Sequence, residues 1–273
     1  MTLTIGTGPF GPQSGGVFNF TADGPAHVLY FEDYPRRVRA VFGGETVIDS
    51  RRVKLLHETG LLPLYYFPFS DVRGDLLEPT DHTTFCPFKG EADYRSVRVG
   101  DRVASNAIWG YPQTIPSAPP IAGYVACYWD AMDAWFEEDE EQFVHAPDPY
   151  HRVDVRASSR HVRVIVEGEV VAESRTPTLL FETSLPPRYY LPAADVRADV
   201  LVPSETTSRC PYKGTASYRS VRVGGAIAPD LVWTYPEPRA EVAQLAGLYC
   251  FYNERTDIEV DGELQPRPLT RFS

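Results

Sequence analysis

The chain has 273 residues, of which 43% are hydrophobic, and a formal net charge of −11. This composition is typical of a globular protein, and the negative charge disfavours nonspecific binding to nucleic acid or to an anionic membrane surface. Because no apolar run approaches a membrane span and the first residues lack the regions of a signal peptide, we expect a soluble, cytoplasmic protein without nucleic-acid or membrane partners.

The first 24 residues differ from the rest by their high content of glycine, proline and serine. This composition predicts an extended arm over residues 1–24. Its aromatic residues, Phe10, Phe18 and Phe20, are the candidates for packing the arm onto the rest of the chain.

Short segments that alternate apolar and polar residues follow the arm. Residues 37–42 and 45–48 alternate in this way around Gly43-Gly44, which predicts a β-hairpin with one buried and one exposed face. Lys54–Glu58 fits a short strand or one turn of helix, and residues 71–73 fit a short helix or a turn. Because the chain has 25 prolines and no long helical period, we predict a mainly β protein with short helices.

The strongest helix candidate spans residues 130–142 and carries an acidic run from Glu137 to Glu141. Such a run is typical of a solvated helix face. The segment leads into Pro147-Asp148-Pro149, which we interpret as a linker.

Beyond the linker, the chain repeats itself. Residues 25–136 align without a gap with residues 149–260, at an offset of 124. The pentapeptide Cys86-Pro87-Phe88-Lys89-Gly90 recurs as Cys210-Pro211-Tyr212-Lys213-Gly214. A period this long indicates two whole domains rather than a solenoid. We therefore predict an arm over residues 1–24 and repeat domains over 25–146 and 147–273, related by a pseudo-twofold axis and packed on each other.

The residues of the repeat resemble a known family. A series of motifs in fixed order carries the resemblance: the stretch around His151 and Arg152, the segment from Leu180 to Thr183, the Tyr189-Tyr190 pair and the pentapeptide at Cys210. This series is similar to the bacterial family called domain of unknown function 427, in its tandem form. The resemblance implies a β-tent fold, in which two antiparallel sheets meet at an angle. The family is sometimes labelled nucleotidyltransferase-like, but the sequence shows neither paired carboxylates for Mg²⁺ nor a phosphate loop in support.

The cysteines do not indicate a disulfide scaffold or a metal site. Cys127 and Cys250 stand opposite apolar residues of the other repeat, which predicts core packing. Relatives of the β-tent fold often carry a four-cysteine zinc site, and this sequence has no Cys-x-x-Cys pair. We therefore expect neither a metal nor another cofactor.

The candidate site is built around the two pentapeptides. Lysine occurs only at positions 54, 89 and 213 of an arginine-rich chain, so Lys89 and Lys213 are the primary candidates for binding a ligand. Aromatic and acidic residues that recur in both copies complete the predicted site: Tyr66, Tyr94, Trp109 and Tyr111 with Asp71, and Tyr190, Tyr218, Trp233 and Tyr235 with Asp195.

Three functions remain open from the residues. The first is binding of an unknown, anionic small molecule, with one aromatic-lined pocket per domain and the lysine holding the acidic group. The second is an enzyme that uses Cys86 and Cys210 as nucleophile or redox thiol, or a nucleotidyltransferase-like transferase. The third is a structural or interaction module, with each lysine in an ion pair to Asp71 or Glu58, or to their counterparts.

Overall fold

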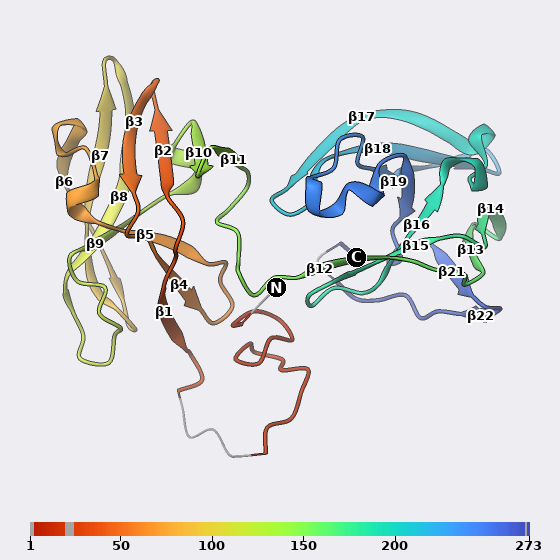
Figure 1. The fold of residues 1–273 in the computed structure, drawn as a ribbon, viewed down its shortest axis with the longest axis horizontal. Coiled ribbons are helices and arrows are strands. Elements are labelled where there is room, and N and C mark those ends of the chain that lie inside the picture. The colour runs from red at the N-terminus through yellow and green to blue at the C-terminus, as the bar shows by residue number, and fades with distance from the viewer. Residues whose placement is uncertain (1–2, 20–24, 271) are drawn as a thin grey trace. The chain divides into compact units, whose positions relative to one another are not determined.

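The computed structural model describes residues 3–19, 25–270 and 272–273, and the chain divides into two compact units, Met1–Tyr150 and His151–Ser273. Within the described residues, each unit contains one seven-stranded and one four-stranded antiparallel sheet (Figure 1). The predictions of a mainly β chain, of two similar halves and of antiparallel sheets are confirmed. The division falls after Tyr150, just beyond the segment that we interpret as a linker.

In the first unit, the larger sheet has the strand order β1-β4-β5-β9-β8-β7-β6 and the smaller one the order β11-β10-β2-β3. Short 3-10 helices connect some of the strands: η1 Phe69–Asp71, η2 Gly74–Leu76 and η3 Trp129–Ala131. The strands are β1 Leu29–Asp33, β2 Val38–Phe42, β3 Glu45–Ser50, β4 Lys54–Glu58, β5 Leu64–Pro68, β6 Leu77–Cys86, β7 Gly90–Val99, β8 Arg102–Thr114, β9 Tyr124–Cys127, β10 Ala134–Glu137 and β11 Glu140–Gln142.

The second unit repeats this topology, with the orders β12-β15-β16-β20-β19-β18-β17 and β14-β13-β21-β22. Its 3-10 helices are η4 Ala193–Asp195, η5 Ala198–Val200 and η6 Ala240–Leu245. The strands are β12 Val153–Ala157, β13 Val162–Val166, β14 Glu169–Ser174, β15 Thr178–Glu182, β16 Arg188–Pro192, β17 Leu201–Cys210, β18 Gly214–Val223, β19 Ala226–Thr234, β20 Leu248–Phe251, β21 Asp257–Val260 and β22 Glu263–Leu264.

The predicted hairpin is strands β2 and β3. Val38, Ala40 and Phe42 are buried and the residues between them are half-buried, as the alternation predicts. Gly43 and Gly44 both have positive φ angles, 61° and 83°. These angles match a type I′ turn, the two-residue turn whose twist fits that of the paired strands.

Strands β4 and β5 of the seven-stranded sheet are buried on both faces, which explains their paired apolar residues. Successive side chains of a strand point to opposite faces. Tyr65 and Leu55 accordingly pack in the core between the two sheets, whereas Tyr66 and Leu56 pack in a second cluster on the other face. The same division separates Tyr189 from Tyr190 in the second unit. The second face carries the candidate site.

The prediction of a helix over residues 130–142 is wrong. The short helix η3 covers only the first residues of this segment. Strands β10 and β11 then pair as a hairpin, in whose turn Glu138 has a φ of 50°. Trp135 and Glu137 are buried and Phe136 between them is half-buried, so the segment has the period of a strand. Glu137 is no solvated helix residue, because its carboxylate accepts hydrogen bonds from the hydroxyls of Tyr34 and Tyr65 and pairs with Arg36.

The described part of the arm, residues 3–19, folds back on itself through turns rather than running extended. Backbone hydrogen bonds join Phe10 N to Leu3 O and Gly15 N to Thr7 O. The rings of Phe10 and Phe18 stack with centroids 6.1 Å apart, and Gly60 N donates to Thr4 O, which ties the arm to the end of β4. Phe20 lies outside the described residues.

None of the helices in the described parts of the chain combines the length and the apolar character that crossing a bilayer requires.

Candidate functional site

The pentapeptide forms the tip of the hairpin between β6 and β7. Cys86 pairs with Gly90, and the backbone N–H of Lys89 donates to the carbonyl of Cys86 across the turn. Gly90 has a φ of 118°, and a Cβ there would lie 2.8 Å from the carbonyl oxygen of Gln113. The final glycine of the motif is therefore required by the turn and by the close approach of β8.

The tip directs Lys89 into a buried charge cluster. Its Nζ donates to Oε2 of Glu58, the last residue of β4, over 2.5 Å, and the residue is only 8% exposed. The other carboxylate oxygen of Glu58 lies 2.9 Å from Nε2 of His27. The ring of His27 in turn stacks on Phe88, the aromatic residue of the motif, at 3.9 Å between centroids. Lysine, glutamate and histidine thus form one connected triad.

The second unit builds the same triad from the equivalent residues. Lys213 pairs with Glu182, whose other oxygen lies 3.0 Å from Nε2 of His151. His151 stacks on Tyr212 at 4.0 Å. Lys213 is also 8% exposed, so both lysines are equally withdrawn from water.

A threonine anchors each histidine segment to the end of the neighbouring strand. The backbone N–H of Val28 donates to Oγ1 of Thr59 over 2.9 Å, and that of Arg152 donates to Oγ1 of Thr183 over the same distance. Because each threonine follows the triad glutamate in the chain, the two anchors fix histidine and glutamate against each other.

The charge cluster keeps the carboxylate of Glu182 ionised. Burial disfavours the charged form, but the hydrogen bond from His151 and the ion pair with Lys213 outweigh it and lower the pKa of Glu182 to about 2. The carboxylate of Glu182 is therefore ionised throughout the neutral and mildly acidic range.

The predicted aromatic residues line the face on which the triad lies. In the first unit, Tyr66, Tyr94, Trp109 and Tyr111 are all buried in one cluster, and Nζ of Lys89 lies 6.0 Å from the centre of the Tyr111 ring. Burial first, and then repulsion from Cys86, Tyr94 and Glu58, raise the pKa of Tyr111. In the second unit, Tyr190, Trp233 and Tyr235 are buried in the equivalent cluster, and Tyr218 packs against it.

A further aromatic pair extends this face. The ring of Tyr128 packs on Trp109 at 4.3 Å, and that of Tyr252 packs on Trp233 at 4.7 Å. The hydroxyl of Tyr252 lies 3.4 Å from that of Tyr218. Tyr128 and Tyr252 occupy equivalent positions of the repeat but were not among the predicted site residues.

The motif cysteines lie beside the tyrosines rather than the lysines. Cys86 and Cys210 are half-buried at the ends of their strands, and Cys86 packs against the aromatic cluster. In the described residues, the hydrogen-bonding partner of each lysine Nζ is the triad glutamate, and no hydrogen bond joins it to the thiol. The geometry therefore offers the thiol no ammonium partner that would favour its thiolate.

Asp71 does not join the lysine. It accepts hydrogen bonds from Ser50 and pairs with Arg52, beyond the start of β4. Glu58 ends that strand, roughly 13 Å further along at about 3.3 Å per residue from Lys54. Asp195 occupies the equivalent position in η4. Of the two acidic partners considered from the sequence, Glu58 is the one that pairs with the lysine.

His27 and His151 are the residues that the sequence-based interpretation missed. They match in the repeat but precede the motif by about sixty residues, so their place in the sequence does not associate them with it. The antiparallel pairing of β1 with β4 brings the segment before β1 next to the end of β4 and so delivers each histidine to its glutamate. Their equivalent positions in the two copies were the available signal.

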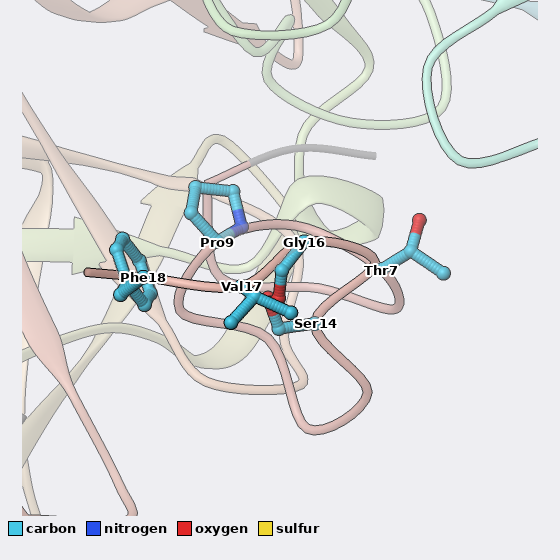
Figure 2. A pocket seen from close by; sticks show the side chains of 6 residues that line it. All are labelled: Thr7, Pro9, Ser14, Gly16, Val17 and Phe18. Atoms are coloured by element: carbon cyan, nitrogen blue, oxygen red, sulfur yellow. The ribbon is translucent and has the colours of Figure 1, made fainter. Parts of the chain in front are cut away.

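The arm contains a separate hollow, which Figure 2 shows from close by. None of the predicted site residues contributes to it, and it has no charged side chain. Its lining residues are Thr7, Pro9, Ser14, Gly16, Val17 and Phe18. We assign no role to this hollow.

Among the residues that the structure describes, no group of three or more histidine, cysteine, aspartate or glutamate residues is arranged to hold a metal ion.

Comparison with known families gives one match. The model of a family described as a domain of unknown function, DUF427, matches residues 30–138 and again residues 154–262. The chain belongs to the DUF427 family. It carries two DUF427 domains in tandem, as the repeat and the resemblance predicted, and both triad lysines and both triad glutamates lie within the matched regions. No curated protein matches the chain.

Proposed function

We propose that this tandem DUF427 protein binds a small molecule that carries an acidic or other oxygen-rich group, at one site in each domain. The site comprises the triad lysine and the aromatic face beside it. The four thiols are free, which favours the reducing cytoplasm as the place of action.

The observation that carries the proposal is the number of hydrogen-bond partners that each lysine ammonium group has. A lysine ammonium has three N–H donors. Within the described residues, one hydrogen-bond partner, Glu58 or Glu182, is present for each Nζ. Nζ of Lys89 lies 6.0 Å from the centre of the Tyr111 ring, and the face of a ring is at most a weak acceptor. An acceptor oxygen of a ligand would satisfy the remaining donors, and the rings would contact its apolar part.

Stability alone explains the triads poorly. Burying an ion pair costs desolvation energy that the attraction between the charges roughly offsets, so apolar residues of the same size serve a core as well or better. Both domains nevertheless keep lysine, glutamate and histidine at equivalent positions, while many neighbouring residues differ. Recognition of a polar ligand supplies a reason for keeping the charges.

A thermal-shift screen tests the proposal. Nucleotides, sugar acids and small aromatic or aliphatic acids are added at millimolar concentration, and the midpoint of thermal unfolding is recorded for each. We expect at least one acid to raise the midpoint. The matched control replaces the pair with neutral residues of similar shape, Lys89→Met with Glu58→Gln and Lys213→Met with Glu182→Gln, and should not respond. A screen without stabilisation, or an equal response in the control, would refute the proposal.

A further inference from the structure

The chain's own C-terminal tail contacts the aromatic face of the second domain at Tyr252. The ring of Phe272 lies 6.2 Å from that of Tyr252, which packs on Trp233. Oγ1 of Thr270 donates to the carboxylate of Glu254 over 2.6 Å. The tail therefore combines an aromatic contact with a polar anchor.

The anchor belongs to a charge pair buried next to the same rings. Arg188 and Glu254 are joined by two hydrogen bonds of 2.7 Å. The guanidinium of Arg188 lies between aromatic groups, 5.6 Å from the ring of Trp233 and 5.9 Å from that of Phe272. Arginine in such a position binds an aromatic ring by cation–π attraction.

Among the described residues, no segment of the first domain takes the part of Thr270 and Phe272. The repeat offset leads from Phe272 to Asp148, which lies beyond the aligned residues and has its carboxylate 3.9 Å from Nδ1 of His57. Leu64 and Asp130 replace Arg188 and Glu254, so the anchor is missing too. Tyr128, the counterpart of Tyr252, is 49% exposed.

We propose that the tail, through Thr270 and Phe272, acts as an internal occupant of the second site, so that ligand binds at the first domain in the intact chain and at the second only when the tail leaves. The occupant also indicates what this part of the site accepts. The ring of Phe272 lies against Tyr252, which packs on Trp233, and Lys213 belongs to the same proposed site, so an aromatic acid would supply both groups. This inference rests on the proposed function for the identity of the site.

The contact itself can be tested without a ligand. In a Trp109→Phe background, Trp233 is the tryptophan of the second unit, and the remaining Trp129 and Trp135 pack in the core between the sheets of the first unit. Truncation after Arg267, or Phe272→Ala where truncation impairs folding, should increase quenching of tryptophan fluorescence by acrylamide. In the matched Trp233→Phe background, the same change should have no effect. Equal quenching with and without the tail in the Trp109→Phe background would show that the tail does not shield Trp233 and would contradict the inference.

Competition with ligand is tested with 8-anilinonaphthalene-1-sulfonate, an aromatic acid whose fluorescence reports binding. The number of probe molecules bound per chain should double when the tail is removed. The added site should disappear when Lys213→Met and Glu182→Gln are introduced. If quenching increases but the stoichiometry stays the same, the tail covers the rings without competing for a ligand, and the inference is wrong. If neither chain binds the probe or any acid of the thermal-shift screen, the proposed function fails, and the quenching result still decides the contact.

Discussion

The two domains keep one feature almost unchanged while the features around it diverge. The distance from histidine Nε2 to the glutamate is 2.9 Å in the first domain and 3.0 Å in the second, and the histidine–aromatic stacks differ by 0.1 Å between 3.9 and 4.0 Å. Phe88 and Tyr212 show that the stack tolerates a change of ring, but the charged residues are identical.

The polar clusters outside the triad differ between the domains. The first domain has the buried carboxylate of Glu137 with two tyrosine hydroxyls, where the second has Asp261 in an exposed turn. The second has the buried Arg188–Glu254 pair, where the first has Leu64 and Asp130. The polar clusters outside the triad are therefore specific to each domain, whereas the lysine–glutamate–histidine triad is common to both.

The largest expected effect lies in a cluster that the domains do not share. Arg188→Leu installs the residue of the first domain and leaves the carboxylate of Glu254 buried without its partner, which should cost about 3–5 kcal/mol in free energy of unfolding. Denaturant unfolding followed by fluorescence measures it. Adding Glu254→Gln should recover most of the loss, whereas Arg73→Leu, which breaks an exposed pair, should change stability little. A small loss for Arg188→Leu would contradict the buried pair.

The next effect is the pH dependence of the second triad. The pKa of Glu182 is about 2 in the folded protein against an ordinary value of 4.5, so its ionised form contributes stability above pH 4.5 that is lost as pH falls towards 2. The shift corresponds to about 3 kcal/mol. Unfolding measured across this range should show a steeper fall for the parent than for Glu182→Gln. Identical slopes would show that the triad does not hold the carboxylate ionised.

The turn glycines should show a smaller effect that differs between the copies. Gly90→Ala and Gly214→Ala both place a Cβ at a positive φ and should each cost about 1–3 kcal/mol. The added Cβ would lie 2.8 Å from a carbonyl oxygen at Gly90 but 3.1 Å at Gly214, so the first substitution should be the more costly. A larger loss at Gly214, measured by the same unfolding assay, would contradict the closer approach of the neighbouring strand to the first tip.

The cysteines should differ in reactivity with little effect on stability. Cys127 and Cys250 are fully packed, and burial raises the pKa of Cys250 to about 12, so a native-state thiol reagent should reach them last. The half-buried Cys86 and Cys210 should be labelled first. Mass spectrometry of partly labelled protein gives the order, and early labelling at Cys127 or Cys250 would show that the cores open.

Local patterns and the repeat were sufficient to predict much of the architecture. The alternation in residues 37–42 and the Gly43-Gly44 turn are properties of neighbouring residues, so the hairpin followed from them. The helix predicted over residues 130–142 failed because its acidic run was interpreted in isolation. The second copy has Asp261-Gly262 in the corresponding turn, a hairpin signal that would have corrected the prediction.

The candidate site was only partly predictable for a different reason. Lys89 and the aromatic residues were found because they recur around a short motif, and the structure places them on one face. His27 was not found, since its contact with Glu58 depends on which strands pair over a distance of 31 residues. Asp71 was included because it recurs, although its recurrence reflects a turn at the other end of the strand pair.

The central claim is that the triads are kept for binding rather than for stability. The most direct test is the free energy of unfolding of the chain in which both pairs are neutralised, Lys89→Met with Glu58→Gln and Lys213→Met with Glu182→Gln. Removing both charges of a pair leaves no buried ion unpaired, so we expect stability within about 1 kcal/mol of the parent at neutral pH, together with loss of the response to acids. A loss of several kcal/mol would show that the triads hold the fold together and would contradict the claim.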